Sequence, residues 1–119
     1  MRLVDIVNLL ELEVLTPDVS LDGGVSTGYA ADLLSCVMAR ARAGTLWITL
    51  QTHPNVVAVG SMLNLAGVIV TEGSHVPNDT IVRAIEEGVP LLATTATTYA
   101  VAGKLMALGI PEAELVSTG

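Results

Sequence analysis

Residues 44–73 read GTLWITLQTHPNVVAVGSMLNLAGVIVTEG, and this stretch decides the fold class. It holds two apolar, β-rich runs, Leu46–Leu50 and Val68–Val70, each of which begins a residue or two after a glycine and ends in polar residues. The residues between them, Asn55–Leu65, have the composition of a helix. Runs that are apolar on both faces are typical of strands in a parallel sheet that helices cover on both sides. The stretch therefore predicts a strand, a crossover helix and a second, parallel strand.

The same unit recurs along the second two thirds of the chain. Gly44, Gly67, Gly88 and Gly109 are separated by 23, 21 and 21 residues, and a third apolar run, Pro90–Ala93, follows Gly88. A glycine just past a helix supplies the left-handed conformation that ends the helix, so we expect these four glycines to cap helices. A leucine-rich solenoid has a similar period, but its Leu-x-x-Leu-x-Leu register is missing. A small layered α/β domain, with a mostly parallel sheet flanked by helices, fits better.

The remaining elements complete a single domain over residues 1–119. Helical spacing predicts a first helix over residues 2–10, and a short strand follows near residues 13–16. A glycine-containing link then leads to a helix over Tyr29–Ala43. Two further helices are predicted over Asp79–Glu87 and Thr97–Leu108, so that βα units run from about residue 44 to residue 108.

Charge and composition exclude several classes of partner. The 5 basic and 12 acidic side chains give a net charge of −7, which repels a nucleic-acid backbone and an anionic lipid surface. The longest apolar stretch, Val56–Val70, has polar interruptions and falls short of the ~20 residues that span a bilayer. The only cysteine is Cys36, so no intramolecular disulfide forms and no zinc-ligand spacing exists. An acid at Asp5 argues against a signal peptide, and we expect a cytoplasmic protein.

Two predicted helices are too apolar for an ordinary surface position. Between Gly44 and Asn78 the only charged residue is Glu72, and the helix Thr97–Leu108 carries only Lys104. In a small domain such helix surfaces usually meet another chain, so we expect a homodimer or larger homo-oligomer. The alternative is that the chain is rich in alanine and valine and these faces are lightly exposed.

Polar residues gather where the predicted parallel strands end, which is the edge where ligands bind in open parallel sheets. Free backbone N–H groups at helix starts, flanked by hydroxyls, suit a phosphate or a carboxylate. Asp32 lies near the start of a predicted helix, where it either stabilises the helix or contacts a ligand. Capping is the other role open to Asn55, Asn78 and Thr97. The candidate ligand-binding residues are Asp32, Gln51, Thr52, His53, Asn55, Thr71, Glu72, Thr94 and Thr95.

Signals for catalysis or for a metal are weak. A general base at His53 needs an orienting carboxylate and a nucleophile within reach, and a sequence shows neither. A zinc site from His53, His75 and Glu72 lacks the i, i+4 pairing of histidines. Cys36 lies among apolar residues of a predicted helix, which favours a buried structural thiol over a nucleophile. The phosphate-binding loop, the dinucleotide-binding glycine motif and the nucleophile elbow are all absent.

The segments GYAADLLSCVM (residues 28–38) and WITLQTHPNVVAV (residues 47–59), with Val68–Gly73 and Gly88–Leu92, resemble the DRTGG domain family in its stand-alone form. The resemblance covers nearly the whole chain. The pentapeptide that names the family is absent, and its nearest fragment is Asp22-Gly23-Gly24. The resemblance implies an α/β domain like the N-terminal domain of HPr kinase, which also occurs in phosphotransacetylases and beside paired CBS domains in regulatory proteins.

The resemblance also implies a class of function, although the family has no established biochemical activity. It suggests a regulatory module that senses a nucleotide or another small anion. Kinase activity is not implied, because the phosphate-binding loop of HPr kinase lies outside the shared domain. The positions that the resemblance brings to the candidate site are Asp32, Gln51, Thr52, His53, Asn55 and Glu72.

The sequence therefore leaves three functional hypotheses open. The first is a non-catalytic regulatory domain, an oligomer that binds a small polar or phosphorylated ligand at the carboxyl edge of its sheet. The second is a protein-interaction module whose apolar helices bind a partner enzyme or domain. The third is a small hydrolase or transferase that uses His53 with Glu72 or a threonine.

Overall fold

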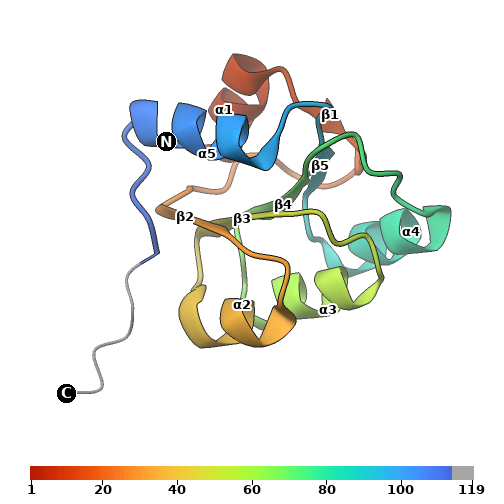
Figure 1. Cartoon of the computed structure of the whole chain (residues 1–119). Coiled ribbons are helices and arrows are strands. Elements are labelled where there is room, and N and C mark those ends of the chain that lie inside the picture. The colour runs from red at the N-terminus through yellow and green to blue at the C-terminus, as the bar shows by residue number, and fades with distance from the viewer. Residues whose placement is uncertain (114–119) are drawn as a thin grey trace.

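Five strands form one sheet in the order β1-β5-β4-β3-β2 (Figure 1). The structure is a computed structural model, and it describes residues 1–113. Strands β2 (Thr27–Ala30), β3 (Thr45–Thr49), β4 (Gly67–Val70) and β5 (Leu91–Ala93) run parallel to their neighbours. The short β1 (Glu13–Val14) pairs antiparallel with β5. The predicted α/β fold with a mostly parallel sheet is confirmed.

Helices cover both faces of this sheet (Figure 1). One face packs against α1 (Leu3–Leu10) and α5 (Thr98–Ala107). The other packs against α2 (Leu34–Arg40), α3 (Asn55–Met62) and α4 (Asn78–Glu87). The three helices that connect neighbouring parallel strands, α2, α3 and α4, all lie in one layer, as crossovers of the same hand require. The other layer is made by α1, which precedes β1, and α5, which follows β5.

The apolar runs of the sequence form the centre of the sheet. All five residues of β3 and all four residues of β4 are buried. Trp47 faces the layer of α2, α3 and α4, while Ile48 faces the layer of α1 and α5. Because each strand supplies side chains to both layers, its residues show no alternation of polar and apolar types. Full burial of one such apolar side chain stabilises the fold by about 1.5–3 kcal/mol.

The prediction of a helix over Tyr29–Ala43 is wrong at its start. Thr27–Ala30 forms β2, and α2 begins only at Leu34. In the ladder Tyr29 lies beside Trp47, and the Ala31 N–H donates to the carbonyl of Ile48 at 3.2 Å. Pairing with the free edge of β3 outweighs the local helix preference of this alanine- and leucine-rich segment.

The prediction that four glycines cap helices holds only in part. Gly88 and Gly109 adopt positive φ (70° and 87°) just after α4 and α5, and Gly44 (φ 86°) turns the chain into β3 after α2 has ended. After α3, which ends at Met62, Asn64 takes the left-handed conformation instead (φ 56°). Gly67 is the first residue of β4, where a Cβ atom would lie 3.2 Å from both the Leu3 Cδ2 atom and the Pro90 carbonyl oxygen.

The two apolar helices differ in how much of their surface the chain covers itself. In α3 four of the eight residues are buried, Val56, Val57, Val59 and Gly60. In α5, by contrast, Tyr99 is 90% exposed and Met106 is 63% exposed. Within residues 1–113 no helix is long and apolar enough to cross a membrane. Large apolar side chains are exposed at α2 and at the end of α3 as well, namely Leu33, Met38 and Met62.

Candidate functional site

The loops that follow β2, β3, β4 and β5 all leave the carboxyl edge of the parallel sheet. All nine predicted ligand-binding residues lie at or just beyond these strand ends. The structure divides them into two groups, one at the ends of β2 and β3 and the other at the ends of β4 and β5. The first group comprises Asp32, Gln51, Thr52, His53 and Asn55, and the second comprises Thr71, Glu72, Thr94 and Thr95.

Asp32 connects the loop after β2 to the end of β3. Its Oδ1 atom accepts from the Thr49 hydroxyl at 2.9 Å and from the Leu50 N–H at 2.8 Å. The Gln51 side-chain amide donates to the Asp32 carbonyl at 3.1 Å. The N-cap position of α2 is Leu33 and has no side-chain cap. The carboxylate of Asp32 therefore positions the loop after β3 and does not cap α2.

His53 fixes the entry into α3. Its Nδ1 atom accepts the backbone N–H of Asn55 at 3.1 Å, so the neutral ring carries its proton on Nε2, in an exposed side chain. Asn55 and Asn78 are the first residues of α3 and α4, and the cap positions are Pro54 and Pro77, so two of the three capping roles expected from the sequence are wrong. The Thr52 carbonyl accepts from the Thr80 hydroxyl at 2.7 Å and joins this loop to α4. In the described part of the chain no carboxylate bonds to His53.

The second group is held together by Glu72. This residue has a positive φ of 64°, and its Oε2 atom accepts the N–H of Thr98 at 2.8 Å. The hydroxyls of Thr71 and Thr98 lie 2.6 Å apart, and Thr97 caps α5 by accepting from the Ala100 N–H. A carboxylate is favoured at the start of a helix. The N-terminus of α5 thus already holds an internal anion, and an anionic ligand would have to displace it.

A polar hollow of about 340 Å³ lies beside this second group. Thr94 and Thr95 line it, together with Ser74 and two glutamates, Glu11 and Glu13. Glu13 reaches this position because β1 runs antiparallel to β5 and pairs with Ala93. Sequence reasoning missed these glutamates, since the pairing of a two-residue strand leaves no periodicity to detect. Two carboxylates disfavour a bare anion in this hollow.

Neither group forms a metal centre. Among residues 1–113 no three His, Cys, Asp or Glu side chains lie close enough together to hold a metal ion. Cys36 is a free, half-buried thiol on α2, more exposed than the buried position expected for it. Exposed polar side chains at the carboxyl edge include Gln51, His53 and Asn55 after β3, His75 after β4 and Thr95 after β5.

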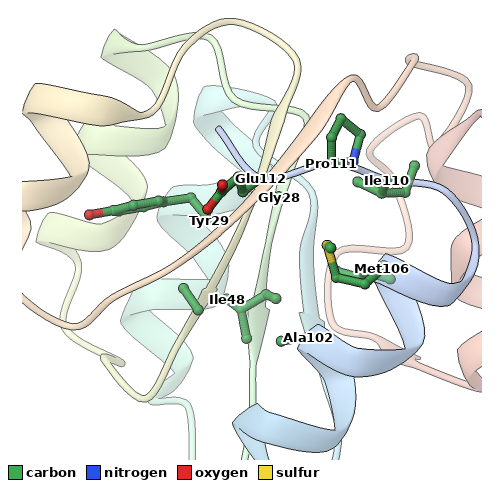
Figure 2. Close-up of a pocket in the computed structure, with 10 residues that line it drawn as sticks. Gly28, Tyr29, Ile48, Ala102, Met106, Ile110, Pro111 and Glu112 are labelled. Atoms are coloured by element: carbon green, nitrogen blue, oxygen red, sulfur yellow. The ribbon is translucent and has the colours of Figure 1, made fainter. Parts of the chain in front are cut away.

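An apolar groove of about 260 Å³ lies between β2 and α5 (Figure 2). Figure 2 shows Ile48, Ala102 and Met106 on one side of β2, while the Tyr29 ring points the opposite way. Residues 110–112 close the groove after α5 ends. Sequence reasoning missed this groove because it depends on β2 being a strand.

No family model matches the chain, and no curated protein matches it either. Among solved structures, the fold is similar to the CBS and DRTGG domains of the regulatory region of a Clostridium perfringens pyrophosphatase, complexed with its activator diadenosine tetraphosphate. The two chains are 15% identical with a TM-score of 0.67, and the match covers 95% of this chain and 49% of that one. This chain thus spans about half the length of that neighbour. The likeness supports a DRTGG-like fold, whereas similarity to HPr kinase and the stand-alone form stay predictions.

Proposed function

We propose that the chain is a regulatory domain that binds a small phosphorylated ligand of the nucleotide class at the carboxyl edge of its sheet, beyond β3. The observation that carries the proposal is the loop after β3, which presents Gln51, His53 and Asn55 to solvent. Asp32 and the start of α3 hold that loop in place through hydrogen bonds. A fixed set of neutral polar groups at this edge suits a small polar ligand. The fold likeness to a regulatory region complexed with a nucleotide supports the ligand class.

The end of β3 is a better position for phosphate than the ends of β4 and β5. At β4 the Glu72 carboxylate occupies the N-terminus of α5, and at β5 two glutamates line the polar hollow. In the loop after β3 the imidazole of His53 and the side-chain amide of Asn55 are exposed hydrogen-bond donors. One carboxylate, that of Asp32, also lies at the end of β3, where its Oδ1 atom accepts from the Thr49 hydroxyl and the Leu50 N–H. Like charge therefore opposes a phosphate there through one carboxylate, against three at the ends of β4 and β5.

Two further features belong to the proposal. The exposed apolar side chains of α5, Tyr99 and Met106, support self-association of the regulatory domain. The free thiol of Cys36 supports a reducing compartment such as the cytoplasm. Light scattering on the purified chain tests the first feature, because a monomer mass across the accessible concentration range contradicts it.

Ligand binding is tested by thermal shift and calorimetry with ATP, AMP and diadenosine tetraphosphate. Adenosine is the control compound, because it lacks phosphate. A true ligand raises the melting temperature with dose, by the equivalent of about 2.7 kcal/mol at a concentration 100 times Kd. We expect His53→Ala and Gln51→Ala to abolish the shift. His75→Ala is the matched control, since His75 is also exposed but lies in the loop after β4.

Either of two results overturns the proposal. One is the absence of a dose-dependent shift with all three phosphorylated compounds. The other is a shift that His75→Ala removes and His53→Ala leaves intact. The protein-interaction alternative has its own support in the apolar groove beside β2.

A further inference from the structure

Residues 1–113 cover the outer edge of β2 only in part. Gly28 N–H donates to the Pro111 carbonyl at 2.8 Å, and the Ala113 N–H donates to the Gly28 carbonyl at 2.9 Å. These two bonds make a single parallel bridge between Gly28 and Glu112. Among the described residues this bridge is the only pairing on that side of β2.

Ala30 presents the next pair of backbone groups on the same edge. The neighbouring Ala31 N–H bonds inward to Ile48 of β3, and backbone groups alternate between the two edges of a strand. The N–H and C=O of Ala30 therefore point outward, as those of Gly28 do. Ala30 is exposed, and within residues 1–113 neither group has a hydrogen-bond partner on that edge. An unpaired strand edge is a template for another extended chain.

The apolar groove adjoins this part of β2. Ala30 is part of its lining, with Ile48 on the neighbouring strand and with Ala102 and Met106 on α5. At about 260 Å³ the groove has room for one aliphatic side chain or ring. A strand that bonds to Ala30 would direct every second side chain toward the face on which this groove lies.

The negative charge at the groove indicates which class of partner it would bind. Among its ten lining residues Glu112 is the only one with a formal charge. The whole chain carries 12 acidic against 5 basic side chains, so a second copy brings mainly repulsive charge to Glu112. A basic segment of a different protein is complementary to both the carboxylate and the net charge of −7.

We propose that the β2 groove, made by Gly28, Ala30, Ile48, Ala102, Met106 and Glu112, binds an extended basic peptide segment of another protein. The peptide backbone pairs with Ala30, an apolar side chain enters the groove, and a lysine or arginine lies beside Glu112. This surface is separate from the loop after β3, so the proposal does not depend on the nucleotide site.

The test uses the full-length chain labelled with ¹⁵N and ¹³C, and two synthetic peptides. The probe is acetyl-Lys-Val-Leu-Val-Lys-amide, and its charge-reversed match is acetyl-Glu-Val-Leu-Val-Glu-amide. We expect the lysine peptide to shift the Ala30 amide and the methyl signals of Ile48 and Met106. The glutamate peptide should bind about threefold to fivefold more weakly, which is the size expected for an exposed ion pair.

Glu112→Gln separates the groove charge from the charge of the whole molecule. We expect it to reduce the preference for the lysine peptide, because the local carboxylate is gone. The matched control is Glu86→Gln, an exposed residue of α4 on the opposite face of the sheet. It makes the net charge less negative by the same one unit, and the preference for the lysine peptide should remain.

Ala30→Pro removes the outward N–H and leaves the pairing with β3 in place, as proline permits on an edge strand. We expect peptide binding to weaken by about twofold to tenfold, the loss of one hydrogen bond. If that variant does not fold, Met106→Lys is the substitute, since it places a cation in the groove at an exposed position.

Four results overturn the proposal. The first is a set of shifts that maps outside the groove, and the second is equal binding of the two peptides. Shifts of the Ala30 amide that grow with protein concentration alone would identify a second copy as the occupant. A change of that signal on deletion of residues 114–119 would identify the chain's own carboxyl-terminal residues instead.

Discussion

At the scale of single residues, polar side chains at the strand ends mainly hold the chain's own loops. Asp32 and Glu72 each accept a backbone N–H from a segment far away in the sequence, Leu50 and Thr98 respectively. Both bonds lie at exposed positions and connect loops to elements 18 and 26 residues away in the sequence. A carboxylate in a loop therefore has the same sequence signature whether it holds a loop or contacts a ligand.

Asp32→Ala should lower the free energy of unfolding by about 1–2 kcal/mol, because the Thr49 hydroxyl and the Leu50 N–H lose their acceptor. Asp32→Asn keeps an oxygen at the Oδ1 position and should lower the free energy of unfolding by a smaller amount. Urea unfolding followed by circular dichroism measures both. Asp18→Ala, at an exposed position in another loop, serves as control, and an equal loss in all three variants contradicts the role assigned to Asp32.

Trp47→Phe should destabilise the fold by about 2–4 kcal/mol. The indole N–H of this fully buried residue donates to the Ala31 carbonyl at 2.8 Å, and the smaller ring leaves both an unpaired carbonyl and a cavity. The change is measured by chemical unfolding with circular dichroism. A loss below 1 kcal/mol would show that this hydrogen bond does not fix the segment after β2 to β3.

At the scale of elements, Gly67 and Gly103 differ in whether the surrounding structure has room for a side chain. Gly67 lies in β4 with the Leu3 side chain and the Pro90 carbonyl close to where a Cβ atom would stand. Gly103 lies in α5, where a Cβ atom would meet nothing within 4 Å. One glycine is required by the close approach of neighbouring elements, while the other only weakens a helix.

Gly103→Ala should raise the free energy of unfolding by about 0.5–1 kcal/mol, the difference in helix preference between the two residues. Gly67→Ala should lower it by about 1–3 kcal/mol, because the added methyl group overpacks the contact between β4, α1 and Pro90. Thermal unfolding of the two variants beside the unsubstituted chain tests the pair. Changes of the same sign in both would contradict the packing described here.

At the scale of the whole molecule, one sheet carries two apolar cores. Trp47, Val68 and Leu91 contribute to the core under α2, α3 and α4, and Ile48 and Ile69 contribute to the core under α1 and α5. Neighbouring residues of the same strands thus belong to opposite cores. Neither core keeps its shape without the sheet, so the two are expected to unfold together.

Urea unfolding followed by Trp47 fluorescence should coincide with unfolding followed by circular dichroism. Trp47 is the only tryptophan and reports on one core, whereas circular dichroism reports on helices of both layers. We expect one midpoint and one slope for the two signals. A fluorescence transition at clearly lower urea would show that the layer of α2, α3 and α4 separates first.

The sequence by itself determined the fold class and the edge of the sheet at which polar residues gather. Strands that are buried on both faces leave continuous apolar runs, and such runs, with the regular glycines, are visible in Leu46–Leu50 and Val68–Val70 without any knowledge of contacts. The tertiary structure alone decided that Thr27–Ala30 is a strand and that β1 brings Glu13 to the carboxyl edge. The tertiary structure also decided which polar side chains at the carboxyl edge bond to the chain's own loops and which are exposed. These outcomes depend on partners distant in the chain, because strand pairing and hydrogen bonds across loops are non-local and leave no periodic signal in the segment that makes them.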